Sequence, residues 1–246
     1  KDNISKIHKI HTCCTQTKKD LIKFGIKKNK IINIPLSVDL DLFKPIDELQ
    51  KKKLKKKYNI PEKKLIIGSF VKDGVGFENG LIPKKIKNPQ MLIKSIKNFP
   101  YKKKIFIILS GPARGYIKKN LKKIGVEYFH KYCSEKKQLA ELYNLTDVTI
   151  INSNLEGGPY SVLESLASGV PVISTKVGLA QDIIKDNKNG FLINKNDNKN
   201  LVNKLKLLLI RKDNLKELKK KSRVSVLSYS FKNIGKKIEK KIYNLI

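Results

Sequence analysis

The feature that most constrains the fold is a series of short apolar runs that alternate with helical patterns. Leu65–Val71, 103–113, 147–154 and Val170–Thr175 are rich in Ile, Leu and Val and lack the polar alternation of a half-buried strand. Consecutive apolar residues predict strands that are buried on both faces, as in parallel sheets. The helical patterns between them predict right-handed crossovers. We therefore expect an α/β protein with a parallel sheet and helices on both of its faces.

One segment, Asn152–Thr175, carries the strongest signals for a binding site. Its sequence is NSNLEGGPYSVLESLASGVPVIST, in which an acid and two glycines form a loop at 156–158. A helix is predicted to begin at 159–161, since proline is favoured in a first helical turn and serine offers a capping hydroxyl. The pair at 168–169 ends the helix, and a short buried strand follows. The segment therefore predicts a loop, a helix and a strand in succession.

The loop in this segment is suited to a polar or anionic ligand. Amides at a helix start point toward whatever lies in front of it, and the helix dipole adds positive potential there. Gly157 and Gly158 allow a ligand to approach the backbone closely. Two carboxylates, Glu156 in the loop and Glu164 one turn into the helix, flank that position.

The two glutamates and the residues between them resemble a known motif. Glu156 and Glu164 form an E-x7-E pattern inside E-G-G-P-x-S-x-L-E, and A-S-G-V-P-V-I-S-T follows. This segment resembles the donor-binding motif of family-4 (group 1) glycosyltransferases of the GT-B fold. The resemblance implies that Glu156 contacts the donor sugar and that Glu164 accepts hydrogen bonds from the nucleotide ribose hydroxyls. It also implies that the amides of Gly157 and Gly158 approach the sugar and the phosphates.

The resemblance places Ser161 and Val162, at the helix start, among the donor-binding residues as well. It implies a Rossmann-like domain, the C-terminal half of a GT-B enzyme. The alternative interpretation is a solvated helix start with exposed acids and no ligand.

Cations follow the first strand of the predicted sheet. The glycines of the loop at 72–89 are not in G-x-G-x-x-G order, so they give no indication of a dinucleotide loop. Family-4 enzymes place an Arg and a Lys after this strand, where they neutralise the donor diphosphate. Lys72 resembles the first, as Lys in place of Arg, and Lys87 the second, with Lys84 and Lys85 as alternatives. Ordinary surface lysines remain the other interpretation.

The resemblance implies transfer of a sugar from a nucleotide-diphosphate sugar with retention of configuration. Glu156, Lys72 and Lys87 are the predicted catalytic residues. Leaving-group stabilisation by the lysines and the helix dipole, with positioning between two domains, would supply the rate enhancement. We expect neither a metal nor a cofactor, since no D-x-D cluster stands at a strand end and the nucleotide sugar is a substrate.

The ends of the chain define the expected domain organisation. Ile34–Pro45 resembles the linker between the two halves of a family-4 enzyme, with Ser37 in place of the usual glycine. Residues 1–45 are therefore predicted to be the tail of an N-terminal domain and the linker. Residues 46–228 are predicted to be the Rossmann-like nucleotide-sugar-binding domain, and residues 229–246 a C-terminal crossover helix. The rest of the N-terminal domain is expected to be missing.

The charge of the chain favours anionic partners. Its 54 Lys and Arg residues against 21 Asp and Glu residues give a formal net charge of +33. Nucleotides and an anionic membrane surface both fit this charge, although general lysine enrichment accounts for part of it. The expected partners are a nucleotide sugar, a glycan or lipid-linked acceptor and the N-terminal domain, with no specific nucleic acid. The alternative function is a non-catalytic nucleotide- or polyanion-binding α/β module, and a dinucleotide oxidoreductase is weaker still.

Several further residues have expected roles. The three cysteines lack zinc spacing and indicate reduced thiols, which favours a cytoplasmic protein. Peripheral contact with the inner membrane surface is left open. Arg114, at the end of the second strand, is expected to face phosphate or solvent, and His130 is expected to be structural. Asp39 and Asp41 are expected to cap turns.

Overall fold

A six-stranded parallel sheet is the main element of the computed structural model, which describes residues 6–243. Its strands are β3 (Leu65–Ser69), β4 (Ile105–Ser110), β5 (Tyr128–Lys131), β6 (Val148–Ile151), β7 (Val172–Thr175) and β8 (Gly190–Ile193). Their order across the sheet is β5-β4-β3-β6-β7-β8. Counted within the sheet this is 3-2-1-4-5-6, the order of doubly wound nucleotide-binding folds. The predicted α/β fold with a parallel sheet is confirmed.

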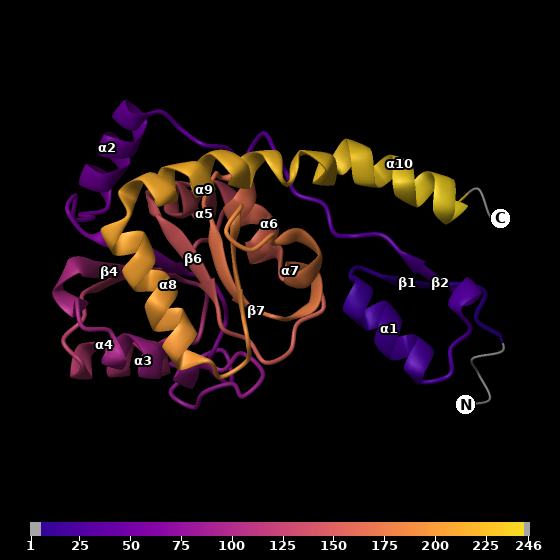
Figure 1. The fold of residues 1–246 in the computed structure, drawn as a ribbon, viewed down its shortest axis with the longest axis horizontal. Coiled ribbons are helices and arrows are strands. Elements are labelled where there is room, and N and C mark those ends of the chain that lie inside the picture. Colours follow the sequence, from indigo (N-terminus) through magenta and orange to yellow (C-terminus); the bar gives the residue numbers. More distant parts are fainter. Residues whose placement is uncertain (1–5, 244–246) are drawn as a thin grey trace.

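Helices cover both faces of this sheet (Figure 1). They are α2 (Glu48–Lys57), α3 (Pro89–Asn98), α4 (Gly115–Lys123), α5 (Lys136–Leu145), α6 (Tyr160–Ala167), α7 (Gly178–Ile183), α8 (Asn198–Ile210) and α9 (Lys212–Val224). Helices α3, α4 and α8 share one apolar cluster with the strands, and α5, α6 and α7 share the clusters of the opposite face. No helix within residues 6–243 is both long and apolar enough to cross a bilayer.

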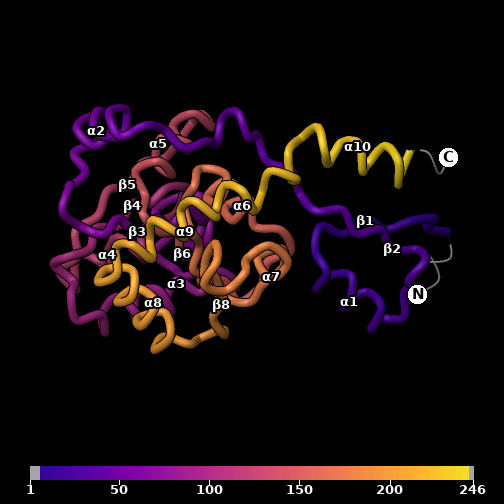
Figure 2. Tube along the Cα trace, turned by 45° about the horizontal axis from the view of Figure 1, so that its top comes forward, coloured from indigo at the N-terminus to yellow at the C-terminus, as the bar shows by residue number. Residues whose placement is uncertain are grey.

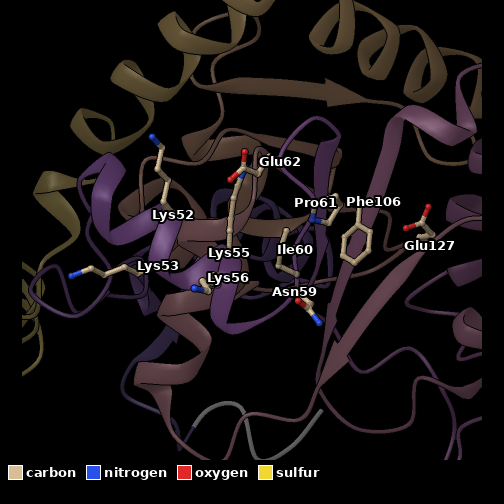
Figure 3. A pocket seen from close by; sticks show the side chains of 10 residues that line it. All are labelled: Lys52, Lys53, Lys55, Lys56, Asn59, Ile60, Pro61, Glu62, Phe106 and Glu127. Carbon is tan, nitrogen blue, oxygen red and sulfur yellow. The ribbon is translucent and has the colours of Figure 1, made fainter.

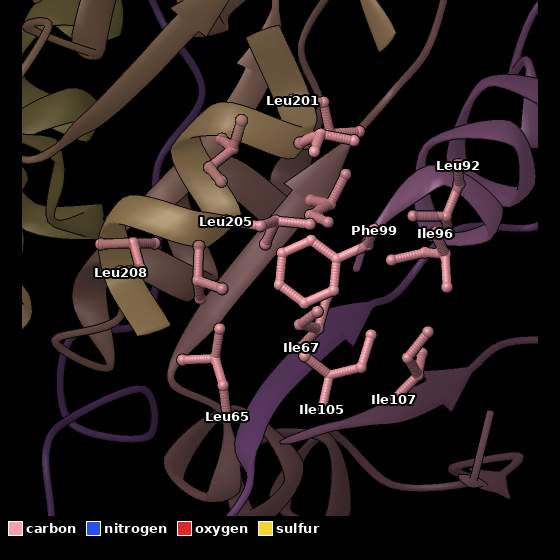
Figure 4. Close-up of a cluster of buried hydrophobic side chains, with 14 of the residues drawn as sticks. Leu65, Ile67, Leu92, Ile96, Phe99, Ile105, Ile107, Leu201, Leu205 and Leu208 are labelled. Atoms are coloured by element: carbon pink, nitrogen blue, oxygen red, sulfur yellow. The ribbon is translucent and has the colours of Figure 1, made fainter. Parts of the chain in front are cut away.

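The two faces of β3 show why its apolar residues are consecutive. Leu65 and Ile67 pack with Phe99 in the cluster under α3 and α8 (Figure 4), whereas Ile66 packs with Leu142 on the other face. Burial of each such side chain stabilises the fold by roughly 1.5–3 kcal/mol. The strands are therefore fixed firmly, and so are the loops at their carboxyl ends.

A smaller unit precedes the main sheet. It consists of β1 (Ile10–Thr12), α1 (Thr15–Lys23), a short 3-10 helix at Lys28–Lys30 and β2 (Ile31–Asn33), which pairs in parallel with β1. The sequence of residues 1–25 predicts one or two helices that end at Gly25. This prediction is wrong for β1, because that strand is stabilised by its distant partner β2 rather than by its own pattern. Gly25 has a φ of 89°, so the predicted glycine after α1 is confirmed. Residues 1–5 of that prediction lie outside the described residues.

The chain returns to this unit at its end. After a 3-10 turn at Leu227–Tyr229, α10 (Phe231–Lys241) runs from the main body toward β1 and β2 (Figures 1 and 2). Lys240 and Lys241 of α10 share a cavity of about 390 Å³ with Ile31 and Ile32 of β2. Residues 244–246 of the predicted crossover helix lie outside the described residues, and the division into domains stays a prediction.

The linker is held to the main body by side chains of both parts. Arg223 of α9 donates to the carbonyls of Phe43, Leu40 and Ala167 at 2.5, 2.9 and 2.8 Å. Asp39 accepts from the amides of the second and third residues after it, as expected for a turn cap. Ser37 is not among the described residues with positive φ, so its substitution for the family's glycine needs no left-handed backbone.

Candidate functional site

The candidate site lies where the strand order of the sheet reverses, between β3 and β6. In doubly wound sheets ligands bind in the crevice at the carboxyl ends of the strands at this point. The loops after the two strands are joined there by hydrogen bonds. Asn152 Nδ2 donates to the carbonyls of Lys87 and Asn88 at 2.8 and 2.7 Å, and the Asn154 amide donates to the Ile86 carbonyl at 2.8 Å. The fold therefore brings two distant predicted segments into one site.

Lys87 and Glu156 form an ion pair at the centre of this site. The Ser153 hydroxyl donates to the same carboxylate oxygen of Glu156 at 2.8 Å. Both charged side chains are largely sequestered, since Lys87 is 21% exposed and Glu156 11%. Of the three lysines considered for this position, Lys87 is the one that contacts the predicted sugar-binding carboxylate.

The glycines beside Glu156 have different surroundings. A Cβ on Gly158 would lie 2.6 Å from Leu36 and 2.9 Å from Cys13, so packing against the linker and the N-terminal unit requires a glycine there. A Cβ on Gly178, which has a φ of 41°, would lie 2.1 Å from the Gly157 carbonyl oxygen. Gly157 itself meets nothing closer than 3.9 Å, and its carbonyl accepts from the Leu179 amide at 2.9 Å. Gly157 is therefore the glycine with room beside it.

Glu164 lies one turn into α6, as predicted. Its Oε2 accepts a hydrogen bond from the hydroxyl of Tyr143 at 3.0 Å. Burial raises the pKa of Glu164 above its ordinary value, and burial also raises the pKa of Tyr143, which stays a donor. Within residues 6–243, no protein donor is found for the other oxygen of Glu164. The carboxylate is thus held by one oxygen, with the second available to accept from a ligand.

A cavity of about 270 Å³ lies at the carboxyl ends of β4 and β5. Phe70 lines it and packs edge-on against Tyr143, the partner of Glu164, with ring centroids 4.5 Å apart. His130 donates through Nε2 to the Gly111 carbonyl at 2.9 Å and so fixes the cavity wall, in agreement with its expected structural role. The remaining lining includes Ser110, Pro112, Tyr132, Cys133, Ser134, Glu135, Lys136 and Leu139.

A larger cavity of about 690 Å³ lies away from the site. It is lined by lysines of α2 together with Ile60, Phe106 and Glu127 (Figure 3). Phe106 is near the amino end of β4, whereas the candidate site lies at the carboxyl ends of the strands. Cavity size alone would therefore misplace the site.

The start of α6 differs in detail from the prediction. Pro159 occupies the N-cap position with no side-chain cap, and Ser161 is the second residue of the helix, so the predicted serine cap is wrong. The Val162 amide donates to the Pro159 carbonyl at 3.0 Å, and the Val162 side chain is in the core. The Val162 amide is therefore already paired and is not free to bind a nucleotide sugar. Ser161 is buried beside it, in the first turn, where helix amides have no carbonyl partner within the helix.

Lys72 lies near the site but is not part of the Lys87–Glu156 pair. Its Nζ is 3.5 Å from the centroid of the Phe77 ring, in the loop that follows β3. The structure thus brings together Lys87, Glu156 and Gly157, and it places Lys72 over the ring of Phe77.

Arg114 contradicts its expected exposure to phosphate or solvent. It is 1% exposed, lies 3.1 Å from Asp73 in an ion pair and donates to the Ser69 and Ser110 carbonyls at 2.7 and 2.6 Å. Arg114 turns inward because the ends of β3 and β4 offer it these acceptors. Burial raises the pKa of Asp73 to about 6, although the nearby guanidinium opposes that shift.

The buried Asp73 makes stability depend on pH in a defined range. Its pKa is about 6 in the folded protein, against 3.8 for an unperturbed aspartate. The folded state therefore holds the proton more tightly, so this group's contribution to the free energy of unfolding decreases as pH rises from about 4 to 6. We expect the free energy of unfolding of wild type to decrease by up to about 3 kcal/mol relative to that of Asp73→Asn over that range. Urea denaturation at several pH values measures it, and a difference that rises with pH would contradict the prediction.

Three residues of the site were not identified from the sequence. Asn152 is 3% exposed, holds the Lys87 loop through Nδ2 and has a buried Oδ1 with no protein partner. Its position directly after a buried strand was the available signal. Tyr143 and Asp73 gave no local signal, because their roles depend on partners that are distant in the sequence. No group of three or more His, Cys, Asp or Glu in residues 6–243 is placed to hold a metal ion.

Comparison with known proteins establishes the family. Residues 50–225, most of the chain, match the family described as glycosyl transferases group 1. The chain belongs to this family. The matched region contains the six-stranded sheet and the candidate site.

Two curated relatives illustrate the similarity. The sulfoquinovosyl transferase SQD2 of Arabidopsis thaliana is 28% identical over 232 residues, which cover 92% of this chain and 42% of that protein. The GalNAc-alpha-(1->4)-GalNAc-alpha-(1->3)-diNAcBac-PP-undecaprenol alpha-1,4-N-acetyl-D-galactosaminyltransferase of Campylobacter jejuni is 32% identical over 137 residues, 54% of this chain and 38% of that protein. The chain thus spans about two fifths of the length of these relatives.

Solved structures show the same fold. Sucrose-phosphate synthase from Thermosynechococcus elongatus matches with a TM-score of 0.82 at 19% identity, over 99% of this chain and 60% of that one. HepE of Anabaena in complex with UDP and glucose matches with a TM-score of 0.79 at 16% identity, over 96% of this chain and 63% of that one. Both matches include the small N-terminal unit, since they cover nearly the whole chain.

Proposed function

We propose that this chain is the donor-binding half of a retaining glycosyltransferase. Such an enzyme would transfer a sugar from a nucleotide-diphosphate sugar to a glycan or lipid-linked acceptor. The observation that carries the proposal is the Lys87–Glu156 ion pair at the switch point of the sheet. The Glu164 carboxylate follows eight residues after Glu156 in the sequence, and the chain belongs to the group 1 family.

The site geometry suggests how a donor would be bound. The ribose hydroxyls would donate to the free oxygen of Glu164, with the base in the cavity of about 270 Å³ at the carboxyl ends of β4 and β5. The diphosphate would lie at the amino end of α6, where the helix dipole and the cations Lys72 and Lys87 favour anions. The sugar would then lie against Glu156 and Gly157. The HepE structure contains UDP and glucose, which agrees with a nucleotide-sugar donor. The name of the Campylobacter relative includes PP-undecaprenol, which agrees with a lipid-linked acceptor.

The proposed chemistry relies on the leaving group. As the glycosidic bond breaks, negative charge develops on the departing diphosphate, and Lys72, Lys87 and the α6 dipole would stabilise it. Glu156, oriented by Ser153 and Lys87, would position the sugar. No further cofactor is proposed. Positioning against an acceptor held by another domain would supply the rest of the rate enhancement.

The N-terminal unit supports a two-domain arrangement. Its two parallel strands form a sheet too small for independent stability, and α10 extends toward it. We propose that this unit belongs to a further domain that completes the active-site cleft. We also propose that the enzyme works in the cytoplasm.

A second candidate function is a non-catalytic polyanion-binding module. The net charge of +33 favours it. Binding of that kind would depend on many lysines, so its affinity would fall steeply with salt. It would not depend on the Glu164 carboxylate.

Thermal denaturation with UDP, GDP, ADP and their sugars tests the proposal. One nucleotide at about 100 times its Kd should add roughly 2.7 kcal/mol to the free energy of unfolding, which raises Tm by several degrees. Glu164→Gln should abolish the shift, because it can still accept from Tyr143 but has lost the charged acceptor for the ribose.

The control is Glu217→Gln, which changes an acid on α9 whose side chain is 55% exposed, away from the site. This variant should keep the full shift. A shift that persists in Glu164→Gln and disappears at high salt would favour the polyanion module instead.

A further inference from the structure

The loop between β3 and α3 exposes an unusual number of large apolar side chains. We call residues 74–86 the flap. Its apolar residues are between 42% and 85% exposed, with Phe77 the most exposed of them. They are Val75, Phe77, Leu81, Ile82 and Ile86. Leu155, 65% exposed, adjoins the flap because its amide donates to the Ile86 carbonyl at 3.3 Å.

The flap is a built structure rather than a loose loop. The Val75 amide donates to the Ile82 carbonyl at 2.9 Å, which closes a small hairpin. At the turn of this hairpin, the first amides of α4 donate to the carbonyls of Asn79 and Gly80 at 2.6 and 2.9 Å. A Cβ on Gly80 would lie 2.2 Å from the Ala113 carbonyl oxygen, so the backbone is packed tightly against the body of the protein. The apolar side chains are therefore held outward by a fixed support.

The exposed charges of the flap are mostly positive. Lys84 and Lys85 lie within it and Lys72 precedes it, whereas its one exposed carboxylate is Glu78. Asp73, at its base, is buried against Arg114 and is not available to an outside partner. The flap therefore combines apolar side chains with cations.

This combination fits an anionic lipid bilayer. Apolar and aromatic side chains enter the boundary between headgroups and acyl chains, and neighbouring lysines bind anionic headgroups. We propose that the flap docks this protein on a membrane surface that contains anionic phospholipids. The proposal does not depend on the proposed transferase function. A protein partner for the same face would have to supply acidic groups around an apolar centre, and it is an alternative that the test separates.

The lysines of α2 provide a natural comparison. The cavity in Figure 3 is lined by Lys52, Lys53, Lys55 and Lys56, so that surface is equally basic. The large exposed apolar residue on α2 is Leu49, at 64% exposure. A bilayer contact that needed charge alone would use α2 as readily as the flap.

Co-sedimentation of the full chain with phosphatidylcholine vesicles, with and without phosphatidylglycerol, tests the proposal. We expect binding that requires phosphatidylglycerol. Phe77→Ser combined with Ile82→Ser should weaken it by about tenfold or more, because two apolar side chains no longer leave water on binding. The matched control, Leu49→Ser combined with Ile210→Ser, removes two other exposed apolar side chains and should bind as wild type does. All of these positions are exposed, so folding should be retained, and Tm checks it.

Fluorescence gives an independent readout, since the chain contains no Trp. Phe77→Trp should show a blue-shifted emission when vesicles with phosphatidylglycerol are added, and Leu49→Trp should not. The proposal is overturned if wild type does not bind these vesicles, or if Lys52→Gln with Lys53→Gln reduces binding more than the flap variant does. It is also overturned if the flap variant loses only self-association in gel filtration, which would make the flap a protein interface.

Discussion

Replacing Arg114 by methionine is expected to lower the free energy of unfolding by about 3–5 kcal/mol, as for other broken buried ion pairs. The guanidinium is almost fully buried and contacts the Asp73 carboxylate. It also donates to the carbonyl and the hydroxyl of Ser69 and to the Ser110 carbonyl. Methionine fills much of the space but donates nothing, so the Asp73 carboxyl and the carbonyls lose their partners. Urea denaturation near neutral pH measures the loss.

Two further variants make this prediction specific. Asp73→Asn combined with Arg114→Met should recover part of the stability lost by Arg114→Met alone, because no buried carboxylate then remains unpaired. Arg211→Met, which alters an exposed arginine between α8 and α9, should change the free energy of unfolding by no more than about 0.5 kcal/mol. The prediction fails if Arg114→Met is as mild as Arg211→Met.

The Arg114 result also shows what a sequence position does not determine. An arginine at the carboxyl end of a strand in a nucleotide-binding fold was expected to face phosphate or solvent. Its partner, Asp73, follows a different strand, and the two meet because β3 and β4 are adjacent. No local pattern reports such a pair, so the sequence could not distinguish an anion-binding arginine from a buried one.

The elements themselves were largely predictable, because each depends on its own residues. Consecutive apolar residues identified β3, β4, β6 and β7. The predicted Val170–Thr175 strand begins two residues later, at Val172. The helix predicted to begin at Asp197 is α8, and Asp197 is its N-cap, with a carboxylate that accepts from the Asn200 amide. The strand β1 was missed, because three residues of ambiguous pattern are stabilised only by pairing with β2.

Site residues that belong to a sequence motif were predictable, whereas those whose role depends on packing against distant residues were not. The E-x7-E spacing located Glu156 and Glu164, and the resemblance pointed to Lys87, with Lys84 and Lys85 as alternatives. The reason for glycine at 158 was not predictable, since a Cβ there would clash with Cys13 of the N-terminal unit and Leu36 of the linker. The catalytic and donor-binding roles of these residues remain predictions.

Replacing Lys87 by alanine is expected to give the largest functional effect. In the full-length enzyme, kcat/KM should fall by about 10²–10³-fold, the typical cost of removing one group that stabilises transition-state charge. The isolated chain should bind a nucleoside diphosphate sugar more weakly. Two causes are to be separated: the loss of a cation from the diphosphate, and the repulsion of an anionic ligand by a Glu156 carboxylate that has lost its partner.

Lys85→Ala is the matched control, since it removes an exposed lysine two positions earlier. Its effect should be within about threefold, as expected for a screened surface charge. Isothermal titration with the nucleoside diphosphate and with the nucleoside alone separates a phosphate contact from a general loss of the site. Lys87→Ala should weaken only the former.

The combination of Lys87→Ala with Glu156→Gln distinguishes the two causes. If Lys87 acts only by neutralising Glu156, removing both charges should restore affinity for the nucleoside diphosphate. If Lys87 contacts the diphosphate directly, the double variant should bind it as weakly as Lys87→Ala does. We expect the second result, because the Ser153 hydroxyl already holds the Glu156 carboxylate at 2.8 Å and the lysine is not needed merely to orient it. Full recovery in the double variant would remove Lys87 from the proposed catalytic residues and leave Lys72 as the remaining candidate cation.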